Sequence, residues 1–336
     1  MRARLLFACA LAGALALAGA MLLSLMLGAT HYGWRQVAAA LLAFDDADYD
    51  QSVIVLQRLP RALMAMFAGA ATACAGAVLQ AMLRNPLASP SLLGVSSGAA
   101  MCVLLVAAAL PGAIDWQGLA AMAGGCLGLL ASMAVARWVG SVDGNGRGLS
   151  LVLAGALVSM FCTAIANALM LTDPQRRDAF MHWLLGNINH VYADRLAQFW
   201  PLGCAGMMLL LVLARPLTLL SLGEDKAAAA GVNVPLLSRL ALLGVALACS
   251  AAVAVCGPLG FVGLAVPHMV RPVMGAALTR LLPGCMLSGA LVCLLADMAA
   301  RTVFAPHALH TGVLLELCGG LAFIAIVRRI YVARPA

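Results

Sequence analysis

The chain has 336 residues, of which 64% are hydrophobic and only 10% are charged. Soluble domains average about 25% charged residues, and a soluble fold cannot hide this much apolar surface. The net charge of +7 does not indicate nucleic-acid binding, because most basic residues fall singly at the ends of apolar runs and form no stripe interleaved with aromatic residues. These observations exclude a soluble globular domain and indicate a protein whose main solvent is lipid.

The apolar runs are long and continuous, which is typical of bilayer-spanning helices and not of the short alternating strands of a membrane β-barrel. We therefore predict an all-α, polytopic membrane protein with about ten transmembrane helices, folded as a single domain over residues 1–336. The predicted spans cover residues 5–27, 62–83, 92–110, 118–136, 149–171, 196–214, 236–256, 260–276, 282–300 and 311–327. The first run could also be a cleaved signal peptide, although it is longer than the ~7–15 apolar residues usual there.

Charged residues differ between the two sides of these spans. Most of the arginines, together with Lys226, fall on one side. The acidic cluster Asp45, Asp46, Asp48 and Asp50 falls on the other side. Because short cytoplasmic loops carry an excess of Lys and Arg, we expect both termini in the cytoplasm and the acidic cluster outside.

Residues inside the spans are mostly small or apolar. The 11 cysteines all fall in apolar runs without a C-x-x-C pair, so we expect them to pack as small hydrophobic residues. Stretches such as AGAATACAGA, residues 68–77, place glycine and alanine within the spans. Small residues let membrane helices approach closely, which predicts a tightly packed bundle.

The sequence contains no energy source of its own. No G-x-x-x-x-G-K-[ST] phosphate loop occurs, and the acidic residues near membrane depth are only Asp297 and Glu316. An uphill transporter of this kind would depend on a partner for energy. A stand-alone ion-coupled carrier and a membrane-embedded enzyme are the alternatives from other classes, but the spans supply no nucleophile–base pair or metal set for an enzyme.

Two segments are candidates for contacts with partner proteins. The stretch SLGEDKAAAAGVNVP, residues 221–235, lies on the predicted cytoplasmic side, and its alanines favour a short helix that could dock on another protein. The alternative is an ordinary connecting loop. On the outer side, RLPR places Arg58 and Arg61 just before a span, and Arg301 follows another span. Exposed arginines can bind carboxylates through forked hydrogen bonds, or simply anchor the ends of spans.

Histidines suggest a different kind of site. His307 and His310 form an H-x-x-H pattern that could direct two imidazoles at a metal or a haem iron, and His31, His182 and His190 share the predicted outer side. No third ligand lies near the pair in sequence, so solvated loop histidines are the alternative. Glu316, inside the last predicted span, is either a functional carboxylate or a protonated, hydrogen-bonded one.

Four blocks of sequence follow one another after residue 50: RLPRALMAMFAGAATACAGAVLQAMLRNPLASPSLLGVSSGAA (58–100), LGEDKAAAAGVNV (222–234), GPLGFVGLAVPHMVR (257–271) and LADMAARTVFAP (295–306). Together they resemble the permeases of bacterial ABC importers for iron–siderophores, haem and vitamin B12, the FecCD type. The resemblance implies a type II ABC importer permease fold in the bacterial inner membrane. It also implies import of an iron–siderophore by alternating access, with haem or cobalamin as alternative substrates.

The resemblance implies partners as well. A second permease subunit, identical or different, would pair with this chain, and two cytoplasmic ATPase subunits would use ATP and Mg. A periplasmic binding protein would deliver the ligand. The chain itself would be neither an enzyme nor a nucleic-acid-binding protein, and it would hold no cofactor or metal.

Residue roles follow from the matching motifs. The arginines implied to dock the binding protein are Arg58, Arg61 and Arg301. The implied ATPase-coupling segment covers residues 216–235, with motif residues Gly223, Glu224, Ala227 and Gly231. The implied cytoplasmic gate consists of Asn85, Leu87 and the loop 143–150, although DGNGRGLS in that loop is not a close match to the family.

The chain departs from the family pattern near its end. It has ALHTGV (308–313) where the family usually has E-L-P-x-G-V, and GGLAF (319–323) where the family often has G-G-P-F-F. Glu316 replaces a small residue. Such changes could alter the subunit contact or the pathway wall, or could mark one member of a heterodimeric pair.

Overall fold

The computed structural model describes residues 2–28, 30–110, 116–139, 147–172, 180–181, 183–186, 188, 193–303 and 309–327. All regular elements in these ranges are helices, which confirms the all-α fold class. In chain order they are α1 (Arg2–Met26), α2 (Trp34–Leu42), α3 (Tyr49–Ser52), η1 (Val53–Arg58), α4 (Leu59–Met82), η2 (Ser91–Leu93), α5 (Val95–Ala109), α6 (Gln117–Val139), α7 (Arg147–Thr172), α9 (Ala193–Val212), α10 (Ala214–Ser221), α11 (Glu224–Ala229), α12 (Val234–Cys256), α13 (Val262–Met274), α14 (Leu278–Thr302) and α15 (Thr311–Val327).

Each of the predicted spans coincides with a helix of the structure, but the helices differ in length. Within the described ranges, seven helices are long and apolar enough to cross a membrane. Helices α5, α13 and α15 are shorter, since α5 and α13 each begin only after an irregular segment that has already entered the bundle. The number of membrane crossings therefore stays a prediction.

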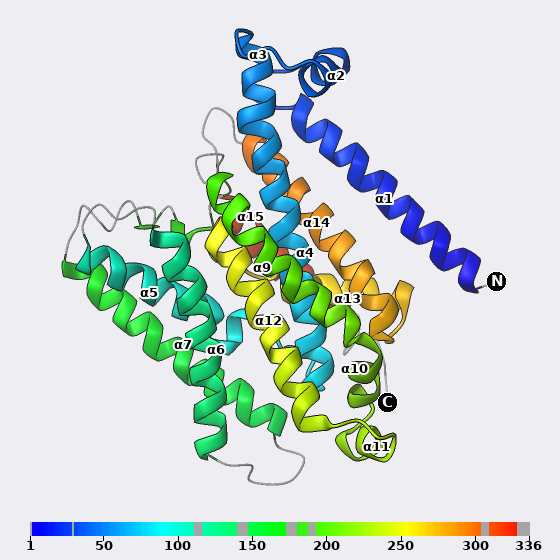
Figure 1. Cartoon of the computed structure of the whole chain (residues 1–336), viewed down its shortest axis with the longest axis vertical. Helices are drawn as coiled ribbons and strands as arrows, with labels where there is room; N and C mark the ends of the chain where they lie inside the picture. Colours follow the sequence, from blue (N-terminus) through cyan, green and yellow to red (C-terminus); the bar gives the residue numbers. More distant parts are fainter. Residues whose placement is uncertain are drawn as a thin grey trace.

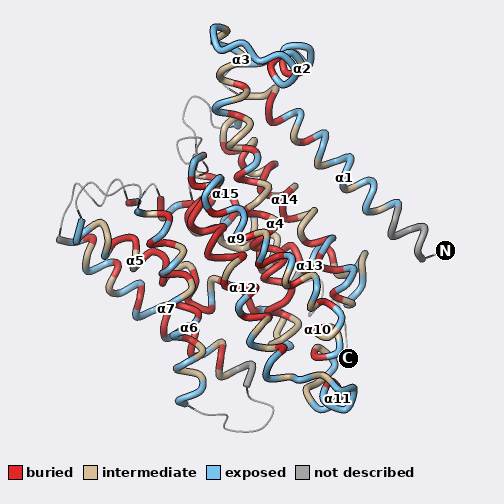
Figure 2. Tube along the Cα trace, in the orientation of Figure 1, coloured by how far each residue is buried: buried red, intermediate tan, exposed pale blue. Residues whose placement is uncertain are grey.

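Helices α4 and α12 form the centre of the molecule (Figure 1), and 78% of the most apolar window of each is buried. Helix α14 packs on α4, and α9 packs on α12. Helices α5, α6 and α7 form a group on one side, while α1 slants away on the other side (Figure 1). Figure 2 shows burial concentrated in the central helices and exposed residues along α1 and α11.

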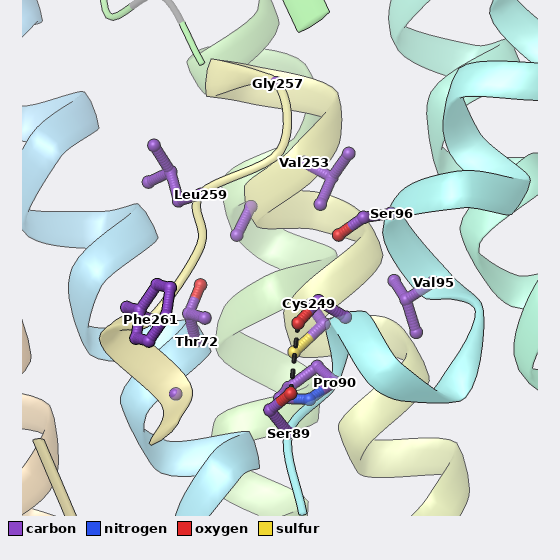
Figure 3. Close-up of a pocket in the computed structure, with 13 residues that line it drawn as sticks. Thr72, Ser89, Pro90, Val95, Ser96, Cys249, Val253, Gly257, Leu259 and Phe261 are labelled. Carbon is purple, nitrogen blue, oxygen red and sulfur yellow. Dashed lines mark hydrogen bonds between the residues drawn. The ribbon is translucent and has the colours of Figure 1, made fainter. Parts of the chain in front are cut away.

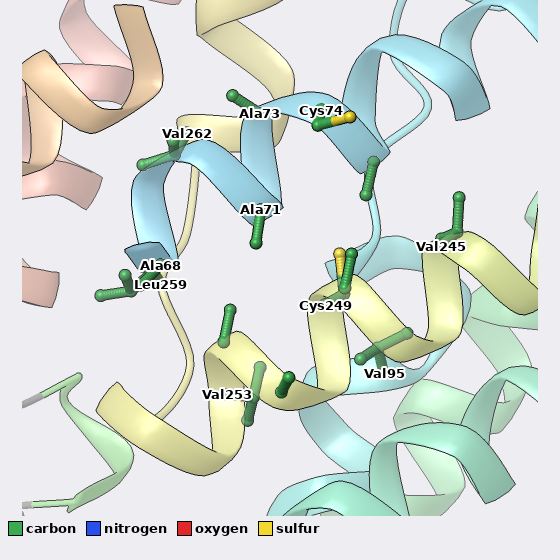
Figure 4. Packing of buried hydrophobic residues seen from close by; sticks show 14 of the residues in the cluster. Ala68, Ala71, Ala73, Cys74, Val95, Val245, Cys249, Val253, Leu259 and Val262 are labelled. Carbon is green, nitrogen blue, oxygen red and sulfur yellow. The ribbon is translucent and has the colours of Figure 1, made fainter. Parts of the chain in front are cut away.

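Glycines allow the central helices to touch backbone to backbone, as the sequence predicts. A Cβ added at Gly69 would overlap the carbonyl of Gly289, so α4 and α14 cross in direct contact at this point. A Cβ at Gly76 would likewise overlap Gly263 of α13. The space between α4 and α12 is filled by alanine, valine and cysteine side chains (Figure 4). This packing needs no large side chain, because small residues maximise contact between membrane helices.

The two ends of the molecule carry different elements. Helices α2 and α3 lie at one end, together with the exposed acidic cluster around Asp46, and α11 lies at the opposite end (Figure 1). The segments that the charge pattern assigns to opposite sides of the membrane are therefore at opposite ends of the bundle. We call them the outer end and the cytoplasmic end below, following the positive-inside prediction.

Candidate functional site

Arg58 lies at the end of η1, a π-helical turn that joins α3 to α4, so that one continuous helix runs over Tyr49–Met82. The sequence predicts this span only from residue 62, after the RLPR stretch. Proline has no N–H to donate to the preceding turn, and a wide π turn accommodates this loss. The π turn places the Arg58 side chain against the end of α1.

The Arg58 guanidinium is committed to partners within the chain. It donates hydrogen bonds to the carbonyl oxygens of Leu25 and Thr30, both at 2.8 Å, and its Cζ atom lies 4.5 Å from the centroid of the Tyr32 ring. The residue is only 6% exposed. The expectation that this arginine is exposed is wrong, and its docking role stays a prediction.

Asp297 is fully buried in α14 and gathers two arginines from different helices. Arg61 of α4 donates from Nε to both carboxylate oxygens at 3.0 and 3.1 Å, and a second guanidinium nitrogen lies 2.9 Å from Oδ1. Arg301 forms an ion pair with Oδ2 at 3.1 Å and donates to the Ser24 hydroxyl of α1 at 2.8 Å. Thr311, the first residue of α15, donates to Oδ1 at 2.9 Å. The carboxylate thus links α4, α14 and α15, and Arg301 links this group to α1 through Ser24.

This outer network, as we call Arg58, Arg61, Arg301, Asp297 and Thr311, carries an excess of positive charge. The network has three guanidiniums and one buried carboxylate, which pairs with Arg61 and Arg301 but not with Arg58. Arg61 and Arg301 keep 15% and 12% of their side-chain surface exposed. A partly desolvated excess charge is stabilised by an anion. The network is therefore suited to a carboxylate-bearing partner at the outer end.

The histidines do not assemble into a metal site within the described residues, where no group of three or more potential metal ligands occurs. His31 is exposed and His310 is half-buried at the start of α15. His182, His190 and His307 lie outside the described residues, and so do residues 143–146 of the loop 143–150, whose other residues begin α7. The metal and haem hypothesis for these histidines has no support in the described part of the chain.

The proline-containing stretch after α4 begins with a tight turn at the cytoplasmic end. The Asn85 carbonyl oxygens, of the side chain and of the backbone, accept hydrogen bonds from the amides of Leu87 and Ala88 at 2.9 and 3.1 Å. This explains how the chain reverses just after Met82, because an Asx turn satisfies amides that a helix no longer pairs. Leu87 is 49% exposed. Its gate role is not tested by this position and stays a prediction.

The same stretch then returns into the bundle instead of starting a helix at the surface. Ser89 and Pro90 reach Thr72, which lies near the middle of α4, and Cys249 in α12 (Figure 3). Together with the irregular segment Gly257–Phe261, they line a cavity of about 20 Å³, roughly enough for one water molecule. Non-helical backbone at membrane depth is tolerated only where protein buries it or where it lines a water-filled cavity.

The predicted coupling segment forms the short helix α11 between two glycines. Gly223 and Gly231 have positive φ angles of 132° and 82°, which explains why glycine stands at both ends of the helix. Ala227 is fully buried, and the Val232 amide donates to its carbonyl at 3.0 Å. The residues of α11 on either side of Ala227 are mostly exposed at the cytoplasmic end.

The predicted coupling segment lies close to the residues just before the predicted gate residue Asn85. A side chain at Gly223 would meet the Arg84 guanidinium at 3.9 Å, and Arg84 immediately precedes Asn85. Glu224 also lines a cavity of about 460 Å³ together with Met82 and Leu83, the residues that lead into the Asn85 turn. The start of α11 and the end of α4 therefore lie close together at the cytoplasmic end.

The fold defines a multi-pass helical membrane protein, and comparison with known proteins identifies the family. The chain belongs to the FecCD transport family, whose model matches residues 14–329. It is 37% identical over 319 residues to the Fe(3+) dicitrate transport system permease protein FecD of Escherichia coli (strain K12), with 94% of this chain and 96% of that protein covered. It is 39% identical over 280 residues to the hemin transport system permease protein HmuU of Yersinia pestis, with 81% and 82% covered.

A solved structure supports the same assignment. A metal-chelate type ABC transporter in an inward-facing conformation matches with a TM-score of 0.78 and 27% identity, over 98% of this chain and 100% of that one. FecC of Escherichia coli (strain K12), a permease of the same dicitrate system as FecD, is 36% identical to this chain, with 86% of this chain and 87% of that protein covered. The chain is thus an ABC permease subunit and not an enzyme, and the pairing of FecC with FecD implies a second permease and an ATPase.

Thr311 of the outer network, and two residues that bind its arginines, are absent from the sequence-based prediction. Ser24, Thr30 and Thr311 carry no motif that distinguishes them, and they reach the arginines only through the fold. The signal that could have found Asp297 is its i, i+4 spacing to Arg301, which places the two side chains on one face of a helix.

Proposed function

We propose that the chain moves a ferric chelate of the siderophore class across the inner membrane, as the permease subunit of an ATP-driven importer that works by alternating access. The observation that carries this proposal is the family match over residues 14–329, together with similar proteins that are iron dicitrate and iron hydroxamate permeases. Haem is the second candidate substrate, because HmuU is among the most similar relatives.

We also propose how the partners attach. Two ATPase subunits that use ATP and Mg would bind the α11 segment of this chain and its partner permease, and both termini would be cytoplasmic. A periplasmic binding protein would dock through acidic side chains on the outer network. The excess positive charge of that network and the exposure of α11 support this arrangement.

Deletion of the gene in its own host tests the substrate proposal. Under iron limitation, the deletion strain should lose uptake of ⁵⁵Fe supplied as ferric siderophore, and the wild-type gene should restore it. Haem uptake should not change. Loss of haem uptake alone would show that haem, and not a siderophore, is the substrate. Unchanged uptake of both would contradict the proposal.

A further inference from the structure

Glu316 is a partly covered but exposed carboxylate on a membrane helix. In α15, Thr311, Gly312 and Leu315 are buried against the bundle. Glu316 is exposed, and so are Leu317 and Leu321, which are 60% and 70% exposed. The Glu316 carboxylate has no hydrogen-bond or ion-pair partner among the residues that the structure describes.

The depth of Glu316 follows from the outer network. Thr311 binds Asp297 at the level of Arg61. Glu316 lies five residues further along α15, about 7.5 Å deeper at 1.5 Å per residue. Ionisable residues at such depth face a bundle interior or a water-filled cavity rather than lipid. The exposed part of the Glu316 side chain therefore meets protein or water.

The surroundings of Glu316 favour water. Its side chain lies on Gly260, where an added Cβ would stand 2.7 Å from Oε1. Gly260 belongs to the irregular segment between α12 and α13, and the next residue, Phe261, has a positive φ of 62° that is unusual for a bulky side chain. This segment and the stretch around Ser89 and Pro90 break the helical backbone together at membrane depth (Figure 3).

Polar groups accumulate at this break. The hydroxyls of Thr72, Ser89, Ser91 and Ser96 line the small cavity on one side of the Gly257–Phe261 segment, and the Glu316 carboxylate contacts Gly260 of the same segment. Irregular backbone and a carboxylate at membrane depth are both typical of residues that line a water-filled pathway.

We infer that Glu316 lies on the wall of the substrate pathway and gives it a fixed negative charge that disfavours anionic chelates relative to neutral or cationic ones. The inference rests on the proposed function, since it names the charge class of the substrate of that same route. Repulsion between a carboxylate and an anionic complex is strong in a partly desolvated route and weak in bulk water. Replacing Glu316 by glutamine removes the charge and preserves the shape.

Carbodiimide labelling tests whether Glu316 faces water. The assembled importer in proteoliposomes is treated with a water-soluble cationic carbodiimide and glycine ethyl ester, which converts accessible carboxylates to amides. Trypsin then releases residues 302–328, in which Glu316 is the only acidic residue. Residues 281–301 serve as a negative control, because their only acidic residue is the buried, ion-paired Asp297.

We expect label on the peptide of Glu316, none on that of Asp297, and none at residue 316 in the Glu316→Gln variant. Labelling of Glu316 only by the apolar reagent dicyclohexylcarbodiimide, or no labelling at all, would overturn the inference. If ATP-dependent uptake is intact in the same vesicles, the proposed function stands while this inference fails.

Chelate uptake tests the charge. The ratio of ⁵⁵Fe uptake from anionic ferric dicitrate to uptake from an uncharged ferric trihydroxamate should rise about tenfold in Glu316→Gln. The control is Leu317→Gln, which adds an amide at the next, exposed position without changing a charge and should leave the ratio at the wild-type value. An unchanged ratio in Glu316→Gln, or an equal rise in both variants, would overturn the charge assignment.

Discussion

At the scale of single residues, the Asp297 carboxylate accepts contacts from Arg61, Arg301 and Thr311 although it has no exposed surface. Burial of a charge is unfavourable unless its partners satisfy it, and here three side chains from three helices do so. Removal of the carboxylate charge would leave two guanidiniums that are mostly buried and lack their anion. The outer end of the bundle is therefore expected to depend on this one side chain.

The substitution Asp297→Asn tests this dependence. We expect a loss of about 3 kcal/mol or more of stability, because it leaves buried charges uncompensated. The measurement is the midpoint of thermal unfolding in detergent. Asp46→Asn is the control, since Asp46 is exposed at the same end. Equal midpoints for both variants would contradict the role given to Asp297.

Arg61 tests the docking proposal with less damage to the fold. Arg61→Lys keeps the charge beside Asp297, whereas Arg61→Gln removes it. We expect Arg61→Gln to weaken binding of the cognate periplasmic protein about tenfold, and Arg61→Lys to weaken it less. The exposed Arg35→Gln variant on α2 controls for general charge at this end. Equal affinities for Arg61→Gln and Arg35→Gln, measured at low salt, would argue against docking on the network.

At the scale of elements, the contact between α4 and α14 depends on glycine. Neither Gly69 nor Gly289 has room for a Cβ, whereas a Cβ at Gly19 in α1 would meet nothing within 4 Å. The same substitution should therefore have opposite effects in the two places.

Gly69→Ala should destabilise the protein by about 1–3 kcal/mol through overpacking. Gly19→Ala should be neutral or slightly stabilising, because alanine favours a helix over glycine. Thermal unfolding in detergent measures both. A destabilised Gly19→Ala variant beside an unaffected Gly69→Ala variant would contradict this account of packing.

The elements also show where the sequence is informative. The long apolar runs predict the helices, and Gly223 and Gly231 bracket α11 as their spacing indicates. The break at Asn85 falls between the predicted spans 62–83 and 92–110. The return of Ser89 and Pro90 to the middle of the bundle depends on contacts with α12 that local pattern does not encode. For the same reason, Arg61 could not be paired with Asp297, which is 236 positions away in the chain.

At the scale of the whole molecule, the charged network and the coupling segment lie at opposite ends of one bundle, and interrupted helices lie between them. This arrangement suits a route that opens alternately to either side when a partner moves α11. The sequence predicts the arginines at one end and the coupling segment at the other from motifs. The contacts that these segments make with the rest of the bundle become visible only in the fold.

Uptake by a purified system tests the central claim most directly. The chain, its second permease and the ATPase are reconstituted in proteoliposomes, and the binding protein loaded with a ⁵⁵Fe chelate is added on the outer side. We predict uptake that requires ATP, the ATPase and the binding protein together. Uptake by this chain alone, driven by a proton or sodium gradient without ATP, would contradict the account.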